Sequence, residues 1–369
     1  MKRRQVATLL TVFAVAVWLA GCGHVEPDSP WLLHVAQFSL PYGNSRLLTY
    51  NYPQLTLKHE RELGSLTTRA MATPGADEIW AGSEGSKDIL MLSASGDSVL
   101  GRASLGASAG ALAFDAAGRW GAMAHGAVIQ HDGEAPNASL ISRKSRQPVR
   151  AFRVGLNPRA ACFDPAGDRL FVGNTGDSTI SVIDLKAGHT VDSLVVGWSP
   201  VNISADPLGR WLYVSCLGMP GHTGRRQGEV HVLALPGLEE LARFEAGQHP
   251  SQVTPLPGGD RILVSELKVG PEVCQLRLFD VAQDAAGAPS ITLKKEIQAG
   301  TNPLAGSLSP DAKVFAVPDF GACRVALIDM EGERFLRWLQ LPGAQGEHFA
   351  VDAVWTRRPG AAIEAAGSP

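Results

Sequence analysis

One repeated stretch constrains the fold of this chain more than any other feature of the sequence. Its clearest copy, DRLFVGNTGDSTISVIDLKAGHTVDSLVVG at 168–197, contains three short apolar strands separated by turns and ends in a glycine. A glycine marks the end of each copy, at spacings of 42 to 53 residues: Gly64, Gly106, Gly155, Gly197, Gly247, Gly300 and Gly343. A period of this length with four strands per unit is typical of a β-propeller, whose sheets bury their faces against one another in a ring.

The two ends of the array predict how the ring closes. After Gly343 there is one clear strand, at 348–356, whereas three strands, at 31–38, 45–51 and 55–62, precede Gly64. One C-terminal strand and three N-terminal strands complete a shared blade, which with the six internal copies makes seven. We therefore predict an all-β, seven-bladed β-propeller over residues 31–356. The alternatives are an open solenoid and a pair of β-sandwiches.

Two adjacent copies carry a family resemblance. The segments 156–197 and 198–216 share an "xxP" head and a "DPxGxxLxV" hairpin, and the first has the third strand "sVIDlxxG". These features resemble YVTN-type β-propeller repeats, with 213-YVSC standing where the repeat has YVTN. The resemblance covers most of the chain from 31 to 356 and is weak in the copy at 107–155. It implies a seven-bladed, commonly extracytoplasmic propeller but no single activity, since relatives include surface proteins, haem d1 domains of nitrite reductases, amine dehydrogenase subunits and lactonases.

The N-terminal segment predicts export and lipidation. A basic start and a short apolar run end in 19-LAGC-22, which resembles a bacterial lipobox. We expect residues 1–21 to be a lipoprotein signal peptide, Cys22 to be acylated, and 22–30 to be a polar tether. An ordinary secretory signal with an accidental cysteine is the alternative. Gly23 favours outer-membrane over inner-membrane sorting on the periplasmic side. At the other end, we expect 357–369 to be a disordered tail.

Charge limits the partners. The formal net charge is −3, and removal of residues 1–21 with their three basic side chains would make it −6. A mildly acidic chain without basic clusters excludes nucleic acid as the main partner. The expected partners are the membrane, through acylated Cys22, and an envelope protein or a small molecule at the channel rim. We expect a monomer.

The candidate site is a polar ring at one end of the predicted channel. Positions two to five residues after each marker glycine should lie at this rim, whereas positions six and eight are mostly apolar. The candidate ligand-binding residues are Arg69, Asn157, Arg159, Asn202, His249, Gln252, Asn302, Glu347 and His348. Two arginines could hold an anionic group, and the two histidines and Glu347 could bind a metal or exchange protons. The competing interpretation is a plain hydrated channel.

Four cysteines remain besides Cys22. Cys274 and Cys323 have the same register, six residues before the aspartate of a third strand, so they should lie at matching ends of adjacent blades. A disulfide between them is possible in an exported protein, although matching positions in neighbouring blades can exceed the required Cα separation of about 5.5 Å. Cys162 and Cys216 are interpreted as small buried apolar residues.

No motif in the sequence specifies a reaction. The chain lacks a phosphate-binding loop and a CxxCH haem attachment, and its one match to GxSxG, 106-GASAG-110, precedes a predicted strand rather than a helix, so it is not a nucleophile elbow. The leading prediction is a membrane-tethered, extracytoplasmic, non-catalytic binding or interaction scaffold without a cofactor. The alternative is a lactonase-like or haem d1-type protein that uses the polar rim; only that alternative calls for haem d1 or a metal.

Overall fold

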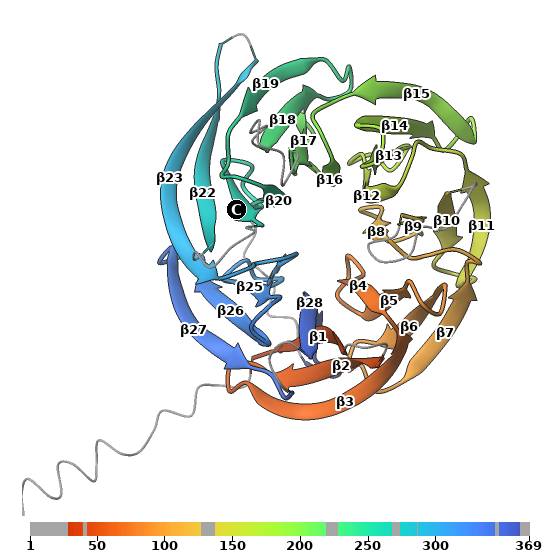
Figure 1. Cartoon of the computed structure of the whole chain (residues 1–369), viewed down its shortest axis with the longest axis vertical. Coiled ribbons are helices and arrows are strands. Elements are labelled where there is room, and N and C mark those ends of the chain that lie inside the picture. Colours follow the sequence, from red (N-terminus) through yellow and green to blue (C-terminus); the bar gives the residue numbers. More distant parts are fainter. Residues whose placement is uncertain are drawn as a thin grey trace, which may run out of the picture.

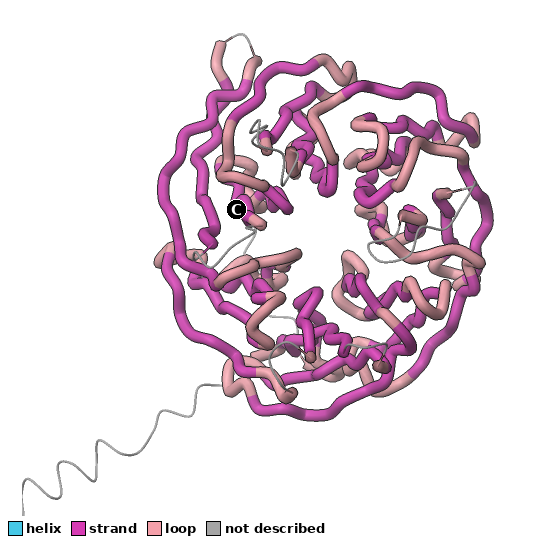
Figure 2. Tube along the Cα trace, viewed as in Figure 1, coloured by secondary structure: helices cyan, strands magenta, loops and turns pink. Residues whose placement is uncertain are grey.

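The computed structural model describes residues 29–39, 43–126, 137–218, 228–267, 274–285, 287–343 and 347–361. Seven four-stranded antiparallel sheets lie around a central axis, with one strand of each sheet innermost (Figure 1), and in Figure 2 the described residues are strands and loops. The predicted seven-bladed β-propeller is confirmed. The expected signal peptide and Cys22, most of the tether, and residues 362–369 of the expected tail lie outside the described residues.

Each internal blade runs outward in chain order. Blade 1 is β4 (Thr67–Ala72), β5 (Glu78–Ser83), β6 (Asp88–Ser93) and β7 (Val99–Ser104); blade 2 is β8 (Ala111–Phe114), β9 (Trp120–Ala124), β10 (Ala138–Ser142) and β11 (Gln147–Phe152). Blade 3 is β12 (Pro158–Phe163), β13 (Arg169–Asn174), β14 (Thr179–Asp184) and β15 (His189–Val195). Blade 4 is β16 (Pro200–Ala205), β17 (Trp211–Cys216), β18 (Glu229–Ala234) and β19 (Glu240–Phe244). Blade 5 is β20 (Pro250–Pro255), β21 (Arg261–Glu266), β22 (Cys274–Gln283) and β23 (Pro289–Gly300), and blade 6 is β24 (Ser307–Leu308), β25 (Val314–Asp319), β26 (Arg324–Asp329) and β27 (Arg334–Gln340).

The seventh blade closes the ring as predicted. It has the order β28 (His348–Arg357), β1 (Trp31–Ser39), β2 (Asn44–Asn51) and β3 (Thr56–Ser65), so the innermost strand comes from the C-terminal end of the propeller. β1 pairs with β28 from Trp31↔Arg357 to Ser39↔His348. Leu33, Leu48 and Trp355 pack together in its core. Closure therefore joins the two ends of the propeller by both backbone hydrogen bonds and apolar contacts.

Burial follows the position of a strand in its blade. The second strands are almost wholly buried, as in β5 and β17, whereas outer strands such as β7 and β15 are mostly exposed. The largest fully buried side chains include Trp80, Phe171, Trp211, Tyr213 and Phe315, all on second strands. These side chains fill the space between adjacent sheets, which explains why the sequence pattern is strongest in this strand.

The recurring aspartate turn also connects blades. The carboxylate of Asp206 accepts hydrogen bonds from Arg210 Nε at 2.8 Å and from Arg210 Nη2 at 2.9 Å. The same guanidinium donates to the carbonyl of Gly259 in the next blade at 2.5 Å. Gly209 in this turn has a φ of 72°, which favours glycine. The motif thus forms a hairpin and links it to the neighbouring sheet.

No helix in the described part of the chain is long and apolar enough to cross a membrane.

Candidate functional site

The central channel contains two adjoining cavities. One, of about 370 Å³, extends from the rim where the innermost strands begin along blades 2 to 4, and is lined by Arg69, Arg159, Asn202 and Gln252 among others. The second, of about 320 Å³, lies toward the opposite rim, near Pro74 and Trp355. Ala70, Met71, Gln252, Ala305 and Asp352 line both cavities. The channel therefore has a common waist, and four of the nine predicted site residues lie on its wall.

The innermost strands share a bulge that sets the direction of their side chains. In β4, β12, β16 and β20 the register shifts by one residue just after the strand begins, so that Thr68, Arg159, Val201 and Ser251 have no partner in the adjacent strand. A bulge re-aims the side chain of its extra residue. The next residue in each strand is Arg69, Ala160, Asn202 or Gln252, and the parallel bridge from Ala305 to Asp352 places those two residues at the same level of the ring.

Most polar side chains at this level connect neighbouring blades. Arg69 Nε donates to the carbonyl of Gly110 at 3.0 Å, and Asn202 Oδ1 accepts from the backbone N–H of Val253 at 2.9 Å. Gln252 exchanges two hydrogen bonds with the backbone of Gly306, at 3.0 and 2.7 Å. These bonds use both polar atoms of the Gln252 amide and the oxygen of Asn202, which explains the presence of these side chains in the ring without a ligand.

Arg159 differs from these residues. It occupies the bulge of β12 and lines the larger cavity, and its Nε is buried without a hydrogen-bond partner in the described structure. Burial lowers the pKa of Arg159, the nearby charge of Arg69 lowers it further, and Glu84 opposes the shift. The backbone of Gly126 packs closely against Arg159. A Cβ added to Gly126 would lie 2.8 Å from Arg159 Cγ, which is too close for a side chain at position 126. Arg159 is thus a confined cation with unused donors.

Asp352 completes the charged group at the waist. Its side chain is buried in β28, Oδ2 accepts the N–H of Ala70 at 2.7 Å, and Oδ1 lies 4.0 Å from Arg69 Nη1. Burial raises the pKa of Asp352 to about 7, although the charge of Arg69 and the bond from Ala70 oppose that shift. The larger cavity therefore has two guanidinium groups on its wall and one carboxyl, paired with Arg69, whose pKa is about 7. Such an arrangement attracts anions.

Sequence analysis missed Asp352 because the marker spacing changes in the closing blade. Asp352 lies nine residues after Gly343, where other copies have a turn, whereas Ala305 at the same level lies five residues after Gly300. Four extra residues precede β28 and shift its register relative to the repeat. Counting residues back from the strong strand at 348–356 would have found this shift.

The other five predicted residues lie at rim turns or at a strand end, and the cavity linings do not include them. His249 Nδ1 donates to the carbonyl of Leu217 at 2.7 Å, and the backbone N–H of Asn302 donates to Asp319 at 2.9 Å. Asn157 has a φ of 48° in the turn before β12, Glu347 is exposed, and His348 begins β28. The described residues form no cluster of three or more metal-ligating side chains, so His249, Glu347 and His348 are not assembled as a metal site.

Three cysteines whose side chains the structure describes, Cys162, Cys216 and Cys323, carry free thiols. Cys323 is a buried free thiol that accepts a hydrogen bond from Gln37 Nε2 at 3.1 Å, so the possible bridge to Cys274 is not formed in this structure; the side chain of Cys274 lies outside the described residues. Cys216 is buried as predicted and Cys162 is partly so, and burial raises the pKa of both thiols to about 12. Thiols with such pKa values are poor nucleophiles.

Comparisons with known proteins support the architecture. No protein-family model and no curated protein matches the sequence. Among solved structures, hydrazine synthase of Kuenenia stuttgartiensis is similar with a TM-score of 0.63 and 14% identity, covering 79% of this chain and 96% of that one. A functionally unknown protein from Desulfotomaculum acetoxidans has a TM-score of 0.70 and 12% identity, over 88% of this chain and 99% of that one. A candidate 6-phosphogluconolactonase from Bacteroides uniformis has a TM-score of 0.68 and 12% identity, over the same shares, 88% and 99%. At these identities the likeness establishes a shared propeller fold and nothing about activity.

Proposed function

We propose that this protein is an extracytoplasmic lipoprotein whose propeller binds a small organic anion in its channel without transforming it. Acylated Cys22 would hold it on a membrane, with outer-membrane sorting on the periplasmic side as the favoured location. The single observation that supports binding most strongly is the buried, unpartnered Nε of Arg159 beside a second arginine. Because the Nε atom itself is enclosed by protein, an anion in the cavity would contact the exposed part of the Arg159 guanidinium and offset its unpaired positive charge.

The cavity wall supports an organic rather than an inorganic anion. Beside Arg69 and Arg159, the larger cavity is lined by Met71, Phe114 and Phe163 and by several alanines. A cavity of about 370 Å³ matches the lower range of small-molecule pockets, which combine apolar walls with a few polar groups. A carboxylate, sulfonate or phosphate could contact the arginines while an apolar body lies on this wall.

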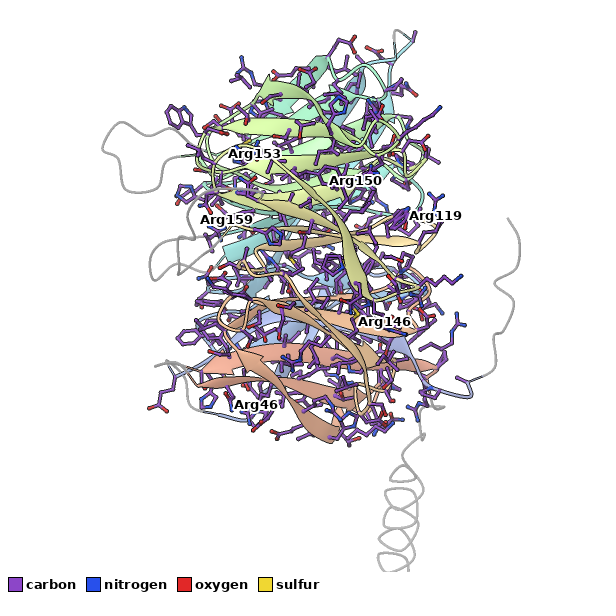
Figure 3. The ribbon with its side chains drawn as sticks, turned by 90° about the vertical axis from the view of Figure 1, so that its right-hand side faces the viewer. Arg46, Arg119, Arg146, Arg150, Arg153 and Arg159 are labelled. Atoms are coloured by element: carbon purple, nitrogen blue, oxygen red, sulfur yellow. The ribbon has the colours of Figure 1, made fainter. Side chains whose placement is uncertain are left out.

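The position of the N-terminal strand supports an outward-facing binding site. Trp31 pairs with Arg357 at the end of β28 and donates from its indole to Asp311 at 3.1 Å, so β1 begins at the rim opposite Arg159. In Figure 3, Arg159 lies toward one edge of the propeller and Arg119 toward the other. A tether of nine residues, 22–30, spans at most about 30 Å. Lipid anchoring through Cys22 would therefore turn the channel rim nearest Arg159 away from the membrane.

Calorimetry with the acylated protein in detergent tests the binding proposal. We expect benzenesulfonate and benzoate to bind and neutral benzyl alcohol not to bind. Arg159→Gln should weaken binding about 10-fold or more, because a hydrogen bond to a charged group contributes roughly 1.5–3 kcal/mol. Arg153→Gln is the matched control, because Arg153 is an exposed arginine at the same edge of the propeller (Figure 3). Failure of every anion to bind, or equal loss in both variants, would refute the proposal.

Anchoring is tested separately. Cys22→Ala should abolish acylation, measured by incorporation of labelled palmitate, and should release the protein from the membrane fraction. Unchanged membrane association in this variant would contradict the lipoprotein assignment.

A lactonase-like hydrolase remains the second candidate, and Asp352 is the observation that favours it. A buried carboxyl with a pKa of about 7 beside Arg69 could exchange protons with a bound ester. Hydrolysis of gluconolactone that disappears in Asp352→Asn would support this function, whereas an inactive wild-type protein that binds anions would exclude it.

A further inference from the structure

The waist of the channel contains the carboxyl of Asp352, which has few charged groups around it. Asp352 lines both cavities, so a ligand in either one would lie near it. Among the described residues that line these cavities, it is the one carboxylate, and Arg69 and Arg159 are the cations. Its oxygens contact the backbone N–H of Ala70 and approach Nη1 of Arg69 at 4.0 Å.

The elements packed around Asp352 supply few other charges. Its partner in β1 is Ala36, and its neighbour in blade 6 is Ala305, both uncharged. From β4 it faces Arg69, which is the charge that acts on its pKa. The charge of Arg69 lowers the pKa of Arg159, and the charge of Glu84 raises it. On its own element, His348 begins β28 and Glu347 precedes it at the rim.

We propose that capture of an organic anion in this channel is coupled to uptake of a proton by Asp352, so that the site binds its ligand more tightly in acid. This inference rests on the proposed anion-binding function. In the free protein at high pH, the ionised carboxylate acts as the counterion of Arg69. A bound anion would take over that role, and the carboxylate beside it would then be repelled unless it were protonated.

The structure favours this exchange in two ways. The bond from Ala70 N–H to Oδ2 can persist when Asp352 is protonated, so the loss of charge needs no rearrangement of the strand. Protonation also releases Nη1 of Arg69, whose Nε remains held by the carbonyl of Gly110. Arg69 would then present its free donors toward the cavity shared with Arg159. The pKa of about 7 for Asp352 places the exchange near neutral pH.

The direction of the pH effect follows from linkage. The anion binds best when Asp352 is neutral, so its affinity is constant below the pKa of the free protein and falls as pH rises above it. The limit is about tenfold per pH unit for one coupled proton. We therefore expect the dissociation constant to rise roughly tenfold between pH 6 and pH 8.

The experiment is titration calorimetry of the acylated protein with benzenesulfonate, whose own charge does not change over pH 5.5–8.5. For the wild type we expect weaker binding at high pH. Repeating the titration at pH 7.5 in triethanolamine and in Tris, two amine buffers that differ in protonation enthalpy and supply no competing oxyanion, should show uptake of a fraction of one proton per ligand. Asp352→Asn should bind at pH 8 as tightly as the wild type binds at pH 6, without pH dependence. Arg153→Gln should retain the wild-type profile.

The outcomes separate this inference from the function on which it rests. Binding that requires Arg159 but is independent of pH, with no proton uptake, would overturn the coupling and leave the anion site intact. A pH dependence that persists in Asp352→Asn would assign the proton to another group and would also overturn the coupling. No binding by the wild-type protein would refute the anion site itself. Proton uptake is measured on the wild type, so the test holds even if Asp352→Asn does not fold.

Discussion

Replacement of Asp352 by asparagine should change how the stability of the protein depends on pH. The pKa of this carboxyl is about 7 in the folded chain, against an ordinary value of 3.8, because burial outweighs the effects of Arg69 and Ala70. The folded state therefore holds this proton more tightly than the unfolded state. Stability is highest where the carboxyl is protonated in both states and falls as pH rises from about 4 to about 7.

The pKa difference sets the magnitude. A shift from 3.8 to about 7 is roughly 3 pH units, and each unit corresponds to 1.36 kcal/mol. Ionised Asp352 should thus cost the wild type about 4 kcal/mol at pH 8 relative to pH 4. Asparagine keeps an oxygen that can accept the N–H of Ala70 and does not titrate. The variant should therefore gain about 4 kcal/mol relative to the wild type over this range.

Urea unfolding from pH 4 to pH 8, followed by tryptophan fluorescence, measures this difference. Subtracting the variant from the wild type cancels the titration of all other groups. Asp168→Asn is the control, because Asp168 is exposed in a turn and its replacement should change the difference by no more than about 0.5 kcal/mol. A difference for Asp352→Asn that is flat with pH, or that favours the wild type at pH 8, would refute the reasoning.

Three further predictions concern the scaffold. Leu33→Ala in the closing blade should lower the free energy of unfolding by about 2–5 kcal/mol in urea denaturation, because Leu33 is fully buried between β28 and β2; a loss below about 1 kcal/mol would mean that closure contributes little. Arg210→Met should lower the melting temperature, because it leaves the buried carboxylate of Asp206 without its guanidinium partner, a loss that destabilises the fold by roughly 3–5 kcal/mol. An unchanged melting temperature would contradict that role. Cys162 and Cys216 should resist iodoacetamide at pH 8 in the folded protein and react in urea, as mass spectrometry would show, since burial raises the pKa of both thiols to about 12; rapid labelling of the folded protein would contradict this.

The fold could be predicted because each blade carries its own local signals. The "DPxG" turn and the apolar strand after it need only neighbouring residues to form, and their repetition reveals the ring. The closing blade was found by counting strands at the two ends. Even the weak copy at 107–155 forms a blade, whose first strand, β8, has four residues and contributes two alanines, a leucine and a phenylalanine to the channel.

The site was predicted only in part because its chemistry depends on contacts between blades. Position in the repeat identified Arg69, Arg159, Asn202 and Gln252 as channel residues. The pattern did not show that Asn202 and Gln252 bond to the backbone of the next blade, since that requires the geometry of the neighbouring strand. Nor does it reveal the bulge that separates Arg159 from these residues.

The strongest argument for binding is the contrast between the polar side chains that form hydrogen bonds to the next blade and Arg159, whose Nε has no hydrogen-bond partner among the described residues. A ring of sheets must satisfy the polar side chains and backbone groups on its inner wall, and at this level it does so from one blade to the next. Arg69 retains one such bond, to Gly110, and Asp352 retains one to Ala70. After these bonds, positive charge remains at the mouth of a channel in a chain whose formal net charge is −3. Local fields in a narrow opening, rather than net charge, decide which ions enter. An acidic protein with an arginine-lined mouth should therefore repel most anions at its surface and hold in its channel those that can reach Arg159.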